Sequence, residues 1–162
     1  MRKVDFYTDG SYSSKTQFGG WASVCLEDDM IIDAQSGFEP YSSNNRMELT
    51  AFLSALENAN TIESSNTYVT IYTDSAYVAN ALNDSWYINW MSNGWRTADR
   101  QKVKNQDLWG RIISLYIKLK KRVNLKVVKV AGHTGNKWNE YVNDLAIKKR
   151  NEFEQKDKEL KH

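Results

Sequence analysis

The sequence predicts an α/β domain built on a mixed sheet. Strand patterns at residues 3–8, 19–26 and 30–36 follow one another, and strand and helix patterns then alternate along the chain. A three-strand meander followed by such alternation is typical of a sheet that contains both antiparallel and parallel strands. The 162 residues suffice for one core. We therefore expect a single domain over residues 1–154, followed by a charged, frayed tail over 155–162.

The remaining elements follow from apolar spacing and capping residues. Ser43 or Asn44 can cap a helix that runs to about residue 60, because Leu49, Phe52 and Leu56 give it one apolar face. Further strands are predicted at residues 67–73 and 124–130, and further helices at 75–82, around 108–119, and from about 139. Residues 84–104 are predicted to be irregular.

Composition restricts the class of protein. The net charge is only +2, although residues 118–129 and 148–150 are basic runs, which taken alone are typical of solvated faces. The single cysteine, Cys25, lies in an apolar run and cannot form an internal disulfide, so we expect a buried thiol and a cytoplasmic protein. No apolar run approaches the roughly 20 residues of a membrane span. We expect a monomer with no membrane partner.

Carboxylates stand where two predicted strands end. Asp9 closes one strand and Asp74 closes another, and Glu48 lies on the core side of the helix between them. Sites in open α/β sheets form beyond the carboxyl ends of parallel strands, so these acids are expected to converge. One acid at a strand end is usually a turn former or a helix cap. Three acids in one place repel one another unless cations are present.

Hard oxygen ligands of this kind suit Mg²⁺, with Mn²⁺ as a substitute. We expect two ions about 4 Å apart when substrate is bound, since such a pair activates a water and stabilises the leaving oxygen of a phosphodiester.

Five motifs occur in a fixed order between residues 3 and 149. They are Thr8-Asp9-Gly10-Ser11, Asn44-Asn45-Arg46-Met47-Glu48-Leu49, Tyr72-Thr73-Asp74-Ser75, Val103-Lys104-Asn105-Gln106-Asp107-Leu108-Trp109 and Gly132-His133-Thr134-Gly135-Asn136. Each motif is weak alone, but together they resemble type 1 ribonuclease H, which cuts the RNA strand of an RNA–DNA hybrid. The resemblance implies a ribonuclease H-like, five-stranded mixed sheet with helices on both faces. It also implies hydrolysis that leaves a 3′-hydroxyl and a 5′-phosphate.

The resemblance assigns roles to particular residues. Asp9, Glu48 and Asp74 would be catalytic metal ligands. His133 would manage protons or help release product, whereas without its flanking motif it would pass for an ordinary loop histidine.

A nuclease specific for hybrids must sense the 2′-hydroxyls of one strand and accept deoxyribose in the other. The resemblance implies that 2′-hydroxyls and the minor groove are contacted by Gly10, Ser11, Asn44 and Asn45. It implies that a phosphate of the DNA strand is held by Ser43 and Asn105. Asn44 and Asn45 also fit a purely structural role as helix caps.

Residues 86–104 resemble the family's basic protrusion, which grips the DNA strand. The substrate contacts expected there are Trp86, Trp95 and Arg96. Trp86 and Trp90 are four residues apart, so at least one of them is expected to pack the protrusion onto the body. Trp95 is the better candidate for a contact with deoxyribose.

The chain departs from the family pattern at its fourth carboxylate. When the chain is aligned with the family pattern without a gap, Asn143 occupies that position, and Asp144 is the next residue. At 100° per residue Asp144 points roughly 160° from the centre of the apolar stripe, whereas Asn143 lies on its flank. Asn143 is therefore the candidate for the fourth catalytic and metal-binding place. Two explanations fit, a natural three-acid site or a residue changed to trap a complex.

Smaller departures concern the RNA strand. Ala76 stands where a glutamine is common, and residues 12–18 lack the usual Gly-Asn-Pro-Gly type of loop.

Three hypotheses for function result. The first is a metal-dependent endonuclease on RNA–DNA hybrids, and the second is a hybrid-binding module whose catalysis Asn143 weakens. The third, another nuclease or transferase with the same fold, such as an integrase-like domain, is disfavoured by the Asn44–Glu48 motif and the protrusion. The fold alone does not separate these classes.

Overall fold

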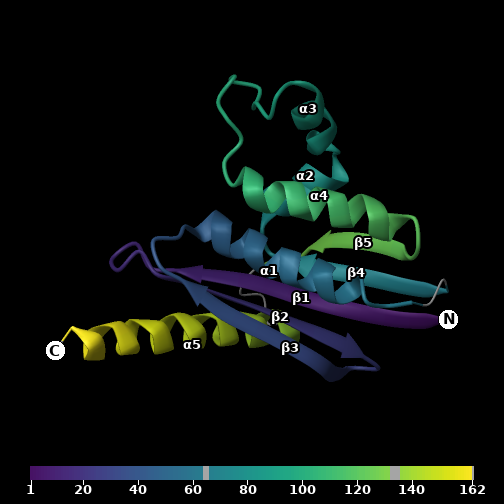
Figure 1. The fold of residues 1–162 in the computed structure, drawn as a ribbon. Coiled ribbons are helices and arrows are strands. Elements are labelled where there is room, and N and C mark those ends of the chain that lie inside the picture. The colour runs from purple at the N-terminus through teal and green to yellow at the C-terminus, as the bar shows by residue number, and fades with distance from the viewer. Residues whose placement is uncertain (64–65, 132–135, 162) are drawn as a thin grey trace.

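The computed structural model describes residues 1–63, 66–131 and 136–161 (Figure 1). Its elements are, in chain order, β1 (Arg2–Tyr12), β2 (Gly19–Glu27), β3 (Met30–Glu39), α1 (Asn44–Ala59), β4 (Thr67–Thr73), α2 (Ala76–Asn83), α3 (Trp86–Ser92), α4 (Gln106–Lys120), β5 (Asn124–Lys129) and α5 (Lys137–Leu160). The strand order is β3-β2-β1-β4-β5. The β1–β2 and β2–β3 pairs are antiparallel, and the β1–β4 and β4–β5 pairs are parallel. The predicted five-stranded mixed sheet is confirmed.

Helices cover both faces of the sheet, as expected. Alternate residues of a strand point to opposite faces, so Val4 and Phe6 of β1 share one face with Val69 and Ile71 of β4. All four are buried in a large core that also contains residues of α1, α2, α3 and α4. On the other face α5 packs against β1, β2 and β3 over a smaller apolar cluster, as Figure 1 shows. In the described ranges no helix is both long and apolar enough to cross a membrane.

Two glycines allow helices to approach the sheet closely. A Cβ on Gly10 would lie 2.6 Å from the backbone nitrogen of Glu48, so only glycine lets α1 rest on β1 there. A Cβ on Gly20 would collide with the carbonyl oxygen of Ala146, which is the corresponding approach of α5 to β2. Both contacts bring a predicted site helix onto the sheet beside Asp9.

Residues 84–104 are not irregular throughout, which corrects the sequence expectation. They contain α3, where Tyr87 and Trp90 are buried. The helix has only two buried positions, too few to give a recognisable period in sequence. Its stability comes from tertiary packing, since the Trp90 and Trp109 rings lie 5.2 Å apart between centroids.

The residues after Glu154 were expected to fray, but α5 continues to Leu160. Its last turns carry side-chain pairs at helical spacing. The Lys161 ammonium lies 2.9 Å from the carboxylate of Asp157, and the Gln155 amide donates to Glu159 at 3.3 Å. Such i, i+4 pairs each contribute about 0.2–0.5 kcal/mol, which favours the helix over a frayed end.

Candidate active site

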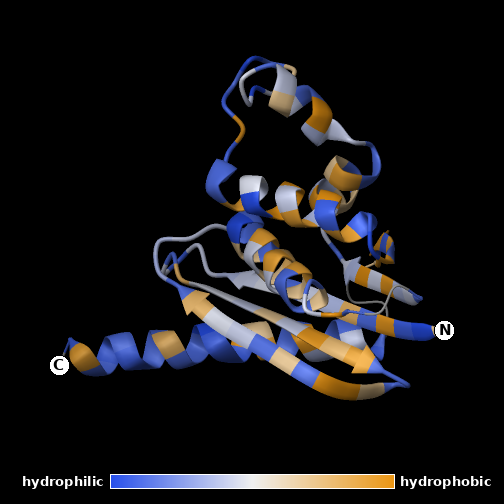
Figure 2. Ribbon diagram, turned by 45° about the vertical axis from the view of Figure 1, so that its right-hand side comes forward, coloured by the Kyte–Doolittle hydropathy of each residue, from blue (hydrophilic) through white to orange (hydrophobic). Residues whose placement is uncertain are grey.

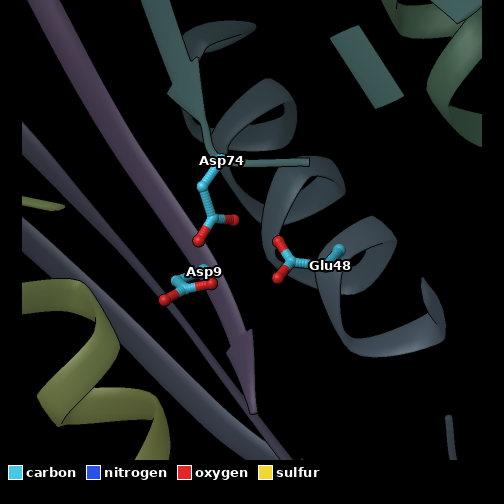
Figure 3. A group of neighbouring side chains, drawn as sticks. All are labelled: Asp9, Glu48 and Asp74. Carbon is cyan, nitrogen blue, oxygen red and sulfur yellow. The ribbon is translucent and has the colours of Figure 1, made fainter. Parts of the chain in front are cut away.

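Three acidic side chains from separate parts of the sequence meet at one edge of the sheet. Each of Asp9, Glu48 and Asp74 offers a carboxylate oxygen, and these three atoms lie within 4.8 Å of one another. Figure 3 shows Asp9 on β1, Asp74 just past the end of β4 and Glu48 on α1, with their carboxylates directed toward a common space. The expected convergence of these acids is therefore present in the structure.

The sheet register sets this geometry. In the parallel β1–β4 pair Tyr7 is opposite Tyr72, so Asp9 and Asp74, two residues further along each chain, reach the same edge. Ser43 begins α1 by accepting a hydrogen bond from the Arg46 N–H at 3.1 Å, so Ser43, not Asn44, is the cap. Glu48 then falls at the close contact of α1 with Gly10.

Burial and mutual repulsion disfavour ionisation of this cluster. Asp9 is 4% exposed and Glu48 is 6% exposed. Burial, with the nearby charge of Asp74, raises the pKa of Asp9 to about 6, although the Gly10 N–H opposes the shift by donating to Asp9 Oδ1 at 2.9 Å. Burial, followed by the charges of Asp9 and Asp74, raises the pKa of Glu48 well above its ordinary value. Nearby cations would reverse this balance.

The residues fit a divalent cation. Glu48 Oε2 is buried and has no hydrogen-bond partner among the described residues, which is costly unless a ligand uses it. Carboxylate oxygens are also the ligand type that hard cations such as Mg²⁺ and Mn²⁺ prefer.

Helix geometry directs Asn143 toward the side of α5 that faces β1. Asn143 and Arg150 are seven residues apart, so they point within about 20° of each other. Arg150 Nη1 donates to Ser11 Oγ at 2.7 Å, and Ser11 and Asp9 share one side of β1. Moving back along α5 from Arg150 therefore brings Asn143 toward Asp9. This direction favours the alignment without a gap, in which Asn143 occupies the fourth carboxylate position.

Asp144 points elsewhere. It is exposed and lines an outer groove along α5 together with Lys148 and Asn151. Val142 and Ala146, on either side in sequence, are buried against Ala22 and Val24 of β2, so the helix cannot turn Asp144 toward the sheet without losing that packing.

The residues that are predicted to contact substrate differ in their exposure and in their hydrogen bonds. Asn44 and Asn45 are exposed in the first turn of α1. The hydroxyl of Ser11 is buried and accepts from Arg150, and Asn105, just before α4, has a left-handed backbone with φ of 60°. Asn105 Oδ1 accepts from Arg46 Nη1 at 3.3 Å. His133 lies outside the described residues.

The protrusion carries both structural and accessible aromatic residues. Trp90 is 6% exposed and packs on Trp109, which confirms that at least one tryptophan fixes the protrusion to the body. Trp86 is 37% exposed, Trp95 is half-buried beside Trp90, and Arg96 is exposed. Among the substrate contacts predicted in the protrusion, Trp86 and Arg96 are therefore exposed, whereas Trp95 is only partly so.

Arg46 is a residue that the sequence reasoning did not single out. Its guanidinium binds both carboxylate oxygens of Asp107, at 3.1 and 2.9 Å, and donates to Glu39 at 2.7 Å. It therefore joins α1, the end of β3 and the start of α4 beside Asn105. Arg46 lies within one of the five sequence motifs, but only the fold shows which residues it binds.

Comparisons with known proteins identify the family of this chain. The RNase H family model matches residues 1–151. The chain is 38% identical over 146 residues to Ribonuclease H of Syntrophomonas wolfei subsp. wolfei, which covers 90% of this chain and 94% of that protein. It is 39% identical over 145 residues to Ribonuclease H of Prosthecochloris aestuarii, with 90% and 93% covered. This chain belongs to the RNase H family.

Solved structures show the same fold. LC9-RNase H1, described as a type 1 RNase H with the type 2 active-site motif, superposes with a TM-score of 0.72 at 23% identity, covering 93% of this chain and 73% of that one. A foamy viral protease-reverse transcriptase in complex with RNA/DNA hybrid gives 0.77 at 24% identity, covering 92% of this chain and 20% of that one.

Proposed function

We propose that this chain is a metal-dependent endonuclease that hydrolyses the RNA strand of RNA–DNA hybrids and leaves a 3′-hydroxyl and a 5′-phosphate. The observation that carries the proposal is the convergence of Asp9, Glu48 and Asp74 within 4.8 Å, with one oxygen of Glu48 buried and unpartnered in the described structure. Membership of the RNase H family supports the reaction class.

The proposed ligands of two Mg²⁺ ions, or of Mn²⁺ as a substitute, are Asp9, Glu48, Asp74 and Asn143. Bound divalent ions would lower the pKa of an attacking water and stabilise the leaving oxygen. The chain itself holds the acids in place through the β1–β4 register and the Gly10 contact with α1. His133 is proposed to handle a proton or assist product release.

Selection of the hybrid is assigned to groups beside the acids. Asn44 and Asn45 are exposed at the start of α1, where their amides can meet 2′-hydroxyls and the minor groove, and Gly10 and Ser11 follow Asp9 on β1. Ser43 and Asn105 are proposed to hold a phosphate of the DNA strand. The backbone N–H groups at the start of α1 favour an anion there.

Trp86, Trp95 and Arg96 of the protrusion are proposed to contact the DNA strand. We further propose a cytoplasmic monomer, in which Cys25 remains a buried thiol.

A second function is favoured by one residue. Asn143 brings no charge to the site, and an amide offers only its oxygen as a ligand. A hybrid-binding module with weakened catalysis is therefore the alternative. It predicts tight hybrid binding with slow cleavage in Mg²⁺.

The decisive experiment uses labelled RNA–DNA hybrid, duplex RNA and duplex DNA, each incubated with the protein in Mg²⁺ or Mn²⁺. We expect cleavage of the RNA strand of the hybrid alone, with greater activity in Mn²⁺. The Asp74→Asn variant serves as the control for a contaminating nuclease. Equal cleavage of duplex DNA would contradict the proposal, whereas binding without cleavage in either metal would support the alternative.

A further inference from the structure

The α5 side of the sheet has a second part, formed by β1, β4 and β5. Alternate residues of these strands form three rows, which the strand register defines. The rows are Lys3, Tyr68 and Asn124, then Asp5, Thr70 and Lys126, then Tyr7, Tyr72 and Val128. We call these nine residues the open face.

Within the described residues, no helix covers most of the open face, and α5 reaches its edge at Tyr7, which packs against the small apolar cluster beneath that helix. α5 packs against β1, β2 and β3, and none of the nine side chains is buried. The residues next to them in the same strands, Val4, Val69 and Val127, point the other way and are buried in the main core. Tyr68 is 44% exposed. Figures 1 and 2 show α5 running below β1–β3, with polar and apolar residues alternating along the strands.

The open face combines aromatic rings with positive charge. The Tyr7 and Tyr72 rings stack with centroids 4.4 Å apart. Tyr68 is four residues before Tyr72 on the same side of β4, roughly 13 Å away at the usual rise of a strand. Lys3 and Lys126 flank this line of tyrosines, and Lys120 lies at the rim of the same cavity of about 710 Å³.

Asp5 is the one acid among the nine residues. Its Oδ1 is buried and accepts no hydrogen bond in the described structure. Because protein atoms cover this oxygen, a ligand meets instead the exposed side chains of the face, which are Lys3, Tyr68, Asn124 and Lys126.

This chemistry distinguishes between classes of ligand. A surface that buries a folded protein partner would be expected to have an apolar, uncharged centre. Here polar and cationic groups alternate with tyrosines instead. Rings for stacking and lysines for phosphates are the combination by which proteins bind single-stranded nucleic acid.

We propose that the open face binds a short single-stranded segment of nucleic acid, with Tyr68 and Tyr72 stacking on bases and Lys3 and Lys126 pairing with phosphates. Tyr7 and Tyr72 each lie two residues before an acid of the active site, so the face continues from that edge. A single strand that leaves the edge follows β4 for roughly 20 Å. If the proposed function holds, this strand is the unpaired extension of a bound hybrid.

The first test measures binding of fluorescent single-stranded DNA and RNA oligonucleotides by anisotropy in EDTA, which prevents cleavage. Tyr68→Ala should weaken binding about tenfold, because stacking on one aromatic ring is worth about that much. Tyr141→Ala is the matched control, since Tyr141 is 42% exposed but lies on α5. Equal affinities of the two variants would overturn the proposal.

The second test concerns the charges. Replacing Lys3 and Lys126 together by alanine should lower the slope of log affinity against log salt by roughly 1.4, because each phosphate on a single strand contributes about 0.7. Lys156 and Lys158, both exposed on α5, provide a control with the same loss of charge. An unchanged slope in the first pair would contradict phosphate contacts on this face.

Mapping by NMR separates the open face from the active-site edge. Oligonucleotides should perturb the amides of residues 68–72 and 124–128. Perturbations confined to the acids and the protrusion would overturn the proposal. Cleavage of a blunt hybrid should be unchanged by Tyr68→Ala. A chain that binds oligonucleotides here but never cuts hybrid would refute the proposed function and leave this inference standing.

Discussion

The acid edge and the protrusion are both expected to meet the substrate, but the fold builds them by different means. Asp9, Glu48 and Asp74 are fixed by the sheet register and by the contact of Gly10 with α1, and two of them are buried. The protrusion is held by the buried side chains of Tyr87, Trp90 and Val103, and by local turns in which Gly94 and Trp95 have positive φ.

Because of this difference, we expect substitutions in the two regions to affect different quantities. Changes at the acid edge alter charges in a rigid, desolvated place, so they should act on the rate of cleavage. Changes in the exposed part of the protrusion alter contacts that compete with water and salt, so they should act on binding. Four measurements test this division.

The largest effect is expected from Asp74→Asn. Removing one carboxylate of the three should lower cleavage in Mg²⁺ by more than about 100-fold, the upper range for residues that only orient metal ligands. Affinity for hybrid in EDTA should change little, because phosphates and 2′-hydroxyls are proposed to be held elsewhere. Single-turnover cleavage and hybrid binding, measured on the same preparation, check this. Full activity would disprove the assigned site.

Asn143→Asp should act in the opposite direction. A fourth carboxylate adds charge where the cations are expected, and cleavage in Mg²⁺ should rise by about 100-fold. Asp144→Asn is the matched control, and it should matter little because Asp144 is exposed on the outer groove. The rates of both variants decide which residue occupies the fourth place. Loss of activity in Asp144→Asn, with no gain in Asn143→Asp, would show that the alignment without a gap is wrong and that Asp144 is the fourth ligand.

The acid edge should also make stability depend on pH when metal is absent. Because burial raises the pKa of Asp9 to about 6 from 3.8, the folded protein binds this proton more tightly than the unfolded chain. The ionised Asp9 carboxylate therefore destabilises the folded protein fully above about pH 6. This destabilisation decreases as the pH falls through that value and vanishes below 3.8, the pKa of Asp9 in the unfolded chain.

The free energy of unfolding of the parent chain in EDTA, relative to Asp9→Asn, should rise by about 2 kcal/mol between about pH 7 and pH 4. Urea titrations of the two proteins measure this difference, which includes the effect of the Asp9 charge on the pKa of Glu48. A difference that does not change with pH would contradict the repulsive, desolvated acid edge.

The smallest effect is expected in the protrusion. Replacing Trp95 by alanine and Arg96 and Arg100 by glutamine should weaken hybrid binding about tenfold. It should also lower the salt slope by roughly 1.8, since each phosphate on a duplex contributes about 0.9. Cleavage at saturating hybrid should be almost unchanged. If affinity and salt slope both stay constant, the segment is structural only.

Much of the fold was predictable because its signals are local. The strand patterns, the capping residue Ser43 and the apolar face of α1 all lie within short stretches of sequence, and each was found within a few residues of its observed place. The acids could be grouped because strand ends in an α/β sheet share an edge. α3 and the last turns of α5 could not be predicted, since Trp90 and Trp109, and the terminal side-chain pairs, act only once their neighbours are in place.

The amino-acid sequence is enough to predict the mixed sheet, the three acids and the amide at position 143. The packing of the chain establishes that Glu48 is buried with an oxygen that has no partner among the described residues, that Arg46 joins three elements and that Asp144 faces away from the sheet. It alone shows that α5 packs against β1, β2 and β3 and, within the described residues, leaves most of the open face uncovered. The physical reason is that side-chain identity and period are properties of the chain, whereas burial, pKa and contact partners depend on which elements pack together.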